Sequence, residues 1–186
     1  MKKNELRKQV LTELKSFPAA SKKKMELEIS KILFQHPAWL SARTVALTLS
    51  LPFEFSTEEI MRHAWAEGKR VVVPIPRYDY SMKFVPFAEG DPLSQSAFGI
   101  WEPLDKEGIQ KSEIDLILVP VLAITRVGDR LGFGGGFFDR YLADYQGTTL
   151  SLVLPFQILP PSAFPVEATD KQIQIVITAD ANRHHS

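Results

Sequence analysis

The residues best suited to chemistry in this chain lie in one short segment, which reads RLGFGGGFFDRYL from residue 130 to residue 142. An arginine precedes a cluster of glycines and an aspartate follows it; the glycines are Gly132, Gly134, Gly135 and Gly136. Glycine lets a ligand approach the backbone closely because it has no side chain. At the start of a helix, unpaired N–H groups and the helix dipole both favour an anion. The segment therefore predicts a phosphate-binding loop.

The charged residues at the two ends of this loop support that prediction. A single glycine would be enough for a tight turn from a strand into a helix, which is the simpler alternative. Arg130 can bind a terminal phosphate through two hydrogen bonds. Asp139 can face a bound phosphate only if a cation lies between them, which implies Mg²⁺. Taken alone, however, Asp139 is better explained as an acidic residue in the first turn of a helix.

The loop differs from the two commonest nucleotide-binding motifs. It is not a Walker loop, because no Gly-Lys-Ser/Thr sequence follows it. It is not the dinucleotide fingerprint, because Phe137 occupies the position where that motif requires its third glycine. Any nucleotide must be held by another arrangement of groups.

The segments around this loop alternate between strand and helix patterns, as in α/β folds. A helix over 57–68 is expected between the first two strands, which suggests a crossover unit and a parallel sheet. The run 114–124 is almost entirely apolar, as expected for a central strand buried on both faces, and the glycine loop should follow it directly. A further helix is expected over 137–145. The strands are expected over 44–51, 69–76, 114–124, 148–155 and 173–180.

Two helices separated by Pro18 are expected at the N-terminus. Leu6, Val10 and Leu14 recur every four residues, and Ser21 is a suitable N-cap for the second helix. We therefore predict a three-layer open, mainly parallel sheet with helices on both faces and an N-terminal helical pair, in a single domain over residues 1–186.

Three further segments complete this outline. Residues 82–87 suggest an added antiparallel strand. Residues 86–113 contain several prolines and glycines and suggest a long surface connection. The polar ending 182–186 is expected to fray.

Composition limits the function. Lys+Arg and Asp+Glu are equal at 22 each, so the chain lacks the overall basic field that drives nonspecific nucleic-acid binding. Cysteine is absent, which excludes disulfides, thiolate metal sites and cysteine nucleophiles. We see no signal-peptide pattern and no apolar run approaching the roughly 18 residues of a membrane span. We expect a cytoplasmic protein without a membrane or nucleic-acid partner.

The segment 114–142, IDLILVPVLAITRVGDRLGFGGGFFDRYL, resembles the signature of the 5-formyltetrahydrofolate cyclo-ligase family, also called 5,10-methenyltetrahydrofolate synthetase. That signature is a strand ending in proline, followed by G-x-R-L-G-x-G-x-G-[YF]-[YF]-D. The resemblance covers nearly the whole chain, through K-x-x-L-R at 3–7, LSLPFEFST at 49–57, GIWEP at 99–103 and FPVEATD at 164–170.

The sequence departs from the commonest pattern at three positions. Phe137 and Phe138 stand where tyrosines are frequent, and Asp170 follows a threonine where histidine is usual.

The resemblance implies a monomeric, ATP-dependent and Mg²⁺-dependent ligase that converts 5-formyltetrahydrofolate to 5,10-methenyltetrahydrofolate. It implies Mg²⁺ near Asp139 and Asp170. It implies folate contacts from Leu49 and Glu54, the latter as the anchor for the amino group and ring N–H of the pterin. Arg130 would be catalytic. ATP would be held by Lys3, Arg7, Arg130, Gly132, Phe133, Gly134, Gly135, Gly136, Phe137 and Phe138.

Other interpretations stay open at this point. Glu54 is equally well explained as an acidic residue at the entry to a helix. His36 and His63 are expected to pack or to face solvent, so no general base is assigned. Open α/β sheets with glycine loops also serve phosphosugar isomerases and coenzyme A transferases, and the same loop could belong to a noncatalytic nucleotide or folate sensor.

Overall fold

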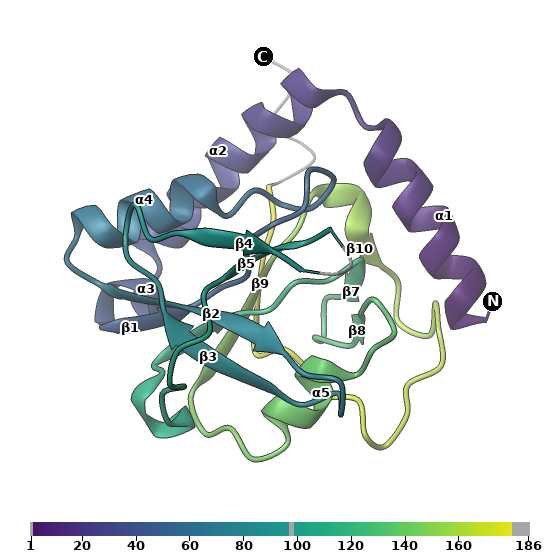
Figure 1. Ribbon diagram of the computed structural model, residues 1–186. Helices are drawn as coiled ribbons and strands as arrows, with labels where there is room; N and C mark the ends of the chain where they lie inside the picture. The colour runs from purple at the N-terminus through teal and green to yellow at the C-terminus, as the bar shows by residue number, and fades with distance from the viewer. Residues whose placement is uncertain (1, 97–98, 180–186) are drawn as a thin grey trace.

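A computed structural model describes residues 2–96 and 99–179, and Figure 1 shows the path of the chain. The polar ending 182–186 lies outside the described residues. The central element is a six-stranded sheet of order β11-β9-β6-β1-β2-β3. Every neighbouring pair in it is parallel except β2 and β3, which confirms the mainly parallel sheet and the added antiparallel strand. The strands are β1 Thr44–Ala46, β2 Arg70–Pro76, β3 Met82–Pro86, β6 Leu116–Leu118, β9 Thr148–Leu152 and β11 Ile175–Ile177.

The expected N-terminal helical pair is present as α1 (Lys3–Ser16) and α2 (Ala19–Gln35). Pro18 is the N-cap of α2, so Ser21 lies inside the helix and its prediction as N-cap was wrong. The short helix α3 (Pro37–Ser41) follows, and α4 (Glu58–Ala66) connects β1 to β2. The last helix is α5 (Phe137–Leu142). No helix in the described part of the chain is long and apolar enough to cross a bilayer.

Alternate residues of the central strands enter two separate cores. Val71 and Val73 pack with residues of α1 to α4, whereas Val72 packs in a second cluster with Tyr141 and Leu142 of α5. This alternation is the result of strand geometry, which directs successive side chains to opposite faces. The sheet therefore has helices on both faces, as predicted.

The apolar run 114–124 does not form one long strand, which corrects the sequence prediction. It is divided into β6 in the central sheet and β7 (Ala123–Thr125), which belongs to a second sheet of order β10-β7-β8. Pro120 stands at the break, and proline has no N–H to donate in the middle of a sheet. In the second sheet β7 pairs with β8 (Arg130–Leu131) and with β10 (Ile158–Leu159).

Because the run is divided, the glycine loop lies at a different place in the fold from the one predicted. The loop follows β8 of the second sheet and opens α5, so it does not leave the central strand directly. The connection 86–113 also contains more structure than predicted, with β4 (Leu93–Gln95) paired to β5 (Trp101–Pro103) and the short 3₁₀ helix η1 (Lys111–Glu113).

Candidate functional site

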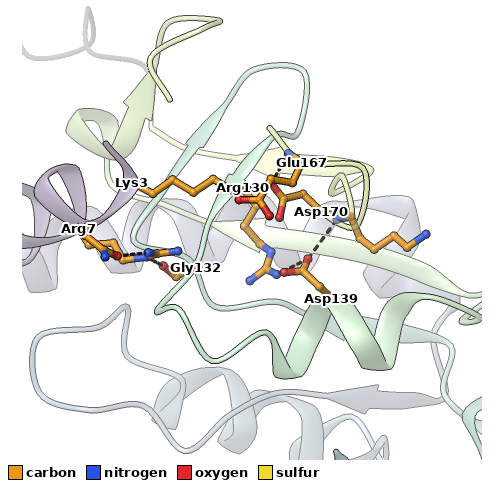
Figure 2. A network of polar contacts seen from close by, with 9 residues as sticks. Lys3, Arg7, Arg130, Gly132, Asp139, Glu167 and Asp170 are labelled. Carbon is orange, nitrogen blue, oxygen red and sulfur yellow. Dashed lines mark hydrogen bonds and ion pairs between the residues drawn. The ribbon is translucent and has the colours of Figure 1, made fainter. Parts of the chain in front are cut away.

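The glycine loop lines a large cavity of about 1130 Å³. The cavity is lined by the start of α1, the glycine loop with α5, the segment 167–171, residues of the β2–β3 hairpin, and Pro120. Figure 2 shows Lys3 and Arg7 reaching from α1 toward Arg130, Asp139 and Asp170. All ten residues predicted to bind ATP therefore line this one cavity, although they come from distant parts of the sequence.

Two glycines of the loop have a conformation that other residues avoid, and a third is closely approached. Gly134 and Gly136 have φ angles of 104° and 70°. At Gly132 an added Cβ atom would come within 2.7 Å of the Arg130 guanidinium. Both constraints favour glycine. The cluster therefore serves the local geometry of the loop as well as leaving its amides accessible.

Arg7 connects helix α1 to the loop. Its Nε donates to the carbonyl of Gly132 at 2.8 Å, and its Nη1 donates to Asn4 Oδ1 at 2.6 Å. One guanidinium thus fixes the first residue of the loop against the helix. Figure 2 shows these bonds.

Arg130 lies deep beside the loop, with a side chain that is only 7% exposed. Its Nη2 donates to Asp139 Oδ1 at 2.7 Å, and the same carboxylate oxygen accepts from the Lys171 amide at 3.1 Å. Its Nε is buried and has no hydrogen-bond partner within the described residues. The guanidinium group also borders the large cavity, where its positive charge suits an anionic ligand.

Lys3 holds the segment 167–171 against α1. Its Nζ lies 2.6 Å from Asp170 Oδ2 and 3.3 Å from Glu167 Oε1. Burial raises the pKa of Asp170, but the hydrogen bond from the Glu167 amide and the Lys3 ammonium outweigh it, so the pKa lies below its usual value. Asp170 is therefore ionised at neutral pH.

The two carboxylates predicted to bind magnesium both border the cavity. Each is paired with a cation, Asp139 with Arg130 and Asp170 with Lys3. The described residues contain no group of three or more His, Cys, Asp or Glu side chains that could hold a metal ion by themselves. Mg²⁺ commonly uses one or two carboxylates together with water and substrate phosphates, so the donor set fits a metal that arrives with a nucleotide.

Glu54 lines a second, much smaller cavity of about 40 Å³. Its Oε2 accepts from the Leu51 amide at 2.6 Å, within the loop between β1 and α4. Burial raises the pKa of Glu54, and the Leu51 hydrogen bond and the charge of Lys22 oppose this increase only in part. Leu49 is half-buried against the larger core and does not line this cavity.

The remaining predicted residues are distributed as follows. Phe133, Phe137 and Phe138 all line the large cavity, and Phe133 is also exposed to solvent. His36 caps α3 through Ala38, and His63 stacks on Phe34, so both histidines lie outside the two cavities as expected.

Sequence reasoning missed several residues at the site. Arg140 and Lys171 each follow a predicted aspartate and line the large cavity, so their adjacency was an available signal. Pro120 lines both cavities, and Gln157 lines the smaller one; no pattern in the sequence indicates this.

A family model described as the 5-formyltetrahydrofolate cyclo-ligase family matches residues 1–179. A protein of Haemophilus influenzae named 5-formyltetrahydrofolate cyclo-ligase is 30% identical over 175 residues, which cover 88% of this chain and 92% of that protein. A probable 5-formyltetrahydrofolate cyclo-ligase of Schizosaccharomyces pombe is 28% identical, with 97% and 96% of the two chains covered.

Solved structures show the same fold. The 5,10-methenyltetrahydrofolate synthetase of Aquifex aeolicus has a TM-score of 0.80 at 24% identity, with 100% of both chains covered. The corresponding protein of Mycoplasma pneumoniae has a TM-score of 0.77 at 23% identity, with 96% of this chain and 99% of that chain covered.

Proposed function

The chain belongs to the 5-formyltetrahydrofolate cyclo-ligase family, and on that premise we propose how its own residues carry out the reaction. It is a ligase of folate one-carbon metabolism, which closes 5-formyltetrahydrofolate to 5,10-methenyltetrahydrofolate with ATP and releases ADP and phosphate. The observation that carries the residue assignment is the convergence of Arg7, Arg130 and the glycine loop on one cavity.

The large cavity is the ATP site in this proposal. Its volume of about 1130 Å³ is ample for a nucleotide, and its cations and loop amides can match the negative charge of a triphosphate. Lys3 and Arg7 bind phosphates from α1, and Arg130, which also lines the cavity, binds the terminal phosphate through its guanidinium group. Phe133, Phe137 and Phe138 form the apolar part of the wall.

Magnesium would be held by Asp139 and Asp170 together with phosphate oxygens. When bound, it would neutralise charge on the nucleotide phosphates. Lys3 and Arg130 now pair with these same carboxylates, so binding of Mg²⁺ and ATP would exchange the partners of all four side chains. The two ion pairs thus keep opposite charges close together until the substrate arrives.

The folate lies with its pterin toward Glu54. A carboxylate can accept from the pterin amino group and from a ring N–H together, as a charge-assisted pair of hydrogen bonds. The cavity of about 40 Å³ is smaller than a typical ligand site, so it represents the inner end of the folate site. Leu49 contacts the substrate from the same loop.

The chemistry needs positioning and charge stabilisation more than a nucleophilic side chain. The formyl oxygen attacks the γ-phosphorus, and the bond from that phosphorus to the bridging oxygen breaks, so that ADP leaves. N10 then attacks the formyl carbon of the iminium phosphate and loses its proton. Phosphate departs with the electrons of the carbon–oxygen bond, which leaves the methenyl bridge. Arg130 and the loop amides stabilise charge on the phosphoryl group during transfer.

The test is to mix the protein with 5-formyltetrahydrofolate and Mg-ATP and to follow methenyl absorbance with and without ATP. We expect product only when ATP is present. Nucleotide or folate binding without turnover would instead identify a noncatalytic sensor. If the protein bound neither ligand, both the ligase and the sensor hypotheses would be wrong. We also propose that residues 1–186 act as one monomeric domain in the cytoplasm, which sedimentation and cell fractionation can check.

A further inference from the structure

The two cavities share one lining residue, Pro120, which belongs to a short stretch of backbone, residues 119–122, that we call the partition segment. The segment is fixed at its ends, because the Val119 amide donates to Leu150 O at 2.8 Å and the Leu122 amide donates to Leu131 O at 2.9 Å. These two bonds attach it to β9 on one side and to β8 on the other.

Two buried side chains bind the carbonyl groups of the partition segment. Ser151 Oγ donates to Val119 O at 2.8 Å. Gln157 Nε2 donates to Leu122 O at 2.9 Å and to Val121 O at 3.3 Å. The carbonyls on both sides of Pro120 are therefore bound by side chains of the protein interior.

The side chain of Gln157 is itself held in place by a hydrogen bond at its other end. Its Oε1 accepts from the Leu154 amide at 2.8 Å, in the 3₁₀ helix η2 (Pro155–Gln157). Ser151 is 0% exposed and Gln157 is 4% exposed, so water cannot replace these donors. A buried carbonyl that loses its donor is costly, and the partition segment would move to find another one. The Gln157 amide group therefore holds this part of the backbone together with Ser151 and the two backbone hydrogen bonds at its ends.

We propose that Gln157 and Ser151 are positioning residues for phosphoryl transfer. By holding the partition segment, they keep Pro120 at the junction of the cavities, where the formyl oxygen must reach the γ-phosphorus. This inference rests on the proposed function. The held segment also restricts the competing reaction, in which a water oxygen bonds to the γ-phosphorus, the bond to the bridging oxygen breaks, ADP leaves and a proton passes to solvent.

The experiment measures ADP and methenyl product in the same reaction mixture. The wild-type protein should form about one ADP per methenyl group. Gln157→Met keeps a side chain of similar length without the amide, and we expect at least a twofold excess of ADP over product. We also expect its kcat to fall about tenfold, while the KM for ATP, whose cavity Gln157 does not line, changes less than threefold. The ratio of products is independent of the folded fraction, so a loss of stability alone cannot change it.

Two more variants test the donor role. Gln157→Glu retains an acceptor for the Leu154 amide but cannot donate to carbonyls when ionised, so its ADP excess should decrease as pH falls and the carboxyl becomes protonated. Ser151→Ala should show a smaller excess than Gln157→Met. These variants decide the question if Gln157→Met does not fold.

The matched control is Gln174→Met. Gln174 also binds β9 through its side chain, accepting from the Thr149 amide at 3.0 Å, but it lines neither cavity. The Gln174→Met variant should still form about one ADP per methenyl group. A ratio of one with unchanged kcat in folded Gln157→Met or in Ser151→Ala would overturn the inference while leaving the proposed function intact. Absence of methenyl product from the wild-type protein would instead refute the proposed function, and this inference with it.

Discussion

The two cavities differ in how their acidic side chains are surrounded. In the large cavity the carboxylates of Asp139 and Asp170 are each paired with a cation, and the pKa of Asp170 lies below its usual value. In the small cavity Glu54 is the single acidic residue in the lining, and burial raises its pKa. Paired charges can exchange partners when a charged ligand and a metal arrive together, whereas an isolated buried carboxylate gains most from a ligand that donates hydrogen bonds. The difference suits a nucleotide at one site and a pterin at the other.

Replacing Arg130 should have the largest effect, because it removes the deepest cation of the large cavity. We expect Arg130→Ala to lower kcat about 10³-fold, a magnitude typical of arginines that stabilise a transferring phosphoryl group. Steady-state kinetics at saturating ATP measures this loss. Arg70→Ala is the control, since Arg70 is an exposed residue paired with Glu113 and lines neither cavity. Unchanged kinetics in Arg130→Ala would remove its phosphate role.

The corresponding change in the small cavity is Glu54→Gln. We expect the Kd for 5-formyltetrahydrofolate to rise roughly 100-fold, because hydrogen bonds to a charged group contribute about 1.5–3 kcal/mol. The KM for ATP should change little, and calorimetry with folate alone separates the two effects. Glu59→Gln, on the exposed face of α4 beside Arg62, should bind folate normally. An equal loss of ATP affinity would show that the two cavities do not act separately.

Lys3 should matter less than Arg130, because its side chain is more exposed, at 15% against 7%. We expect Lys3→Met to raise KM for ATP about tenfold, the value of one charge-assisted hydrogen bond, with little change in folate binding. Lys8→Met serves as the control, because Lys8 lies on the same helix and its side chain is exposed. A larger effect on folate than on ATP would assign Lys3 to the other site.

The smallest effect expected is a shift in pH dependence. The pKa of Glu54 is raised, so this carboxyl becomes protonated at a higher pH than an ordinary glutamate. Folate binding needs the ionised form, and it should therefore weaken as pH falls, beginning above the usual titration range of a carboxyl. Calorimetric titrations at several pH values measure the midpoint. In Glu54→Gln this pH dependence should be absent; if it persists there, another group is responsible.

Sequence patterns predicted the elements better than their connections. Runs rich in apolar and β-branched residues identified the strands of the central sheet, because such side chains fit a pleated surface that is buried on one or both faces. The run 114–124 was misjudged because apolar character alone cannot distinguish one long strand from two strands in different sheets. Pro120 contained that information, since a residue without an N–H group interrupts a ladder. The prediction of Ser21 as an N-cap was wrong because α2 begins directly after Pro18, which is the N-cap itself.

The sequence by itself determined the family, the glycine loop and the identity of the charged residues around it. These are properties of spacing along the chain, and spacing is visible in one dimension. Only the tertiary structure decided that Lys3 pairs with Asp170 and Arg7 with Gly132, across sequence separations of 167 and 125 residues. It also placed Gln157 beside the partition segment and Glu54 in a half-buried loop. Contacts between distant segments, and the burial that shifts a pKa, arise only when the sheet and its helices pack together.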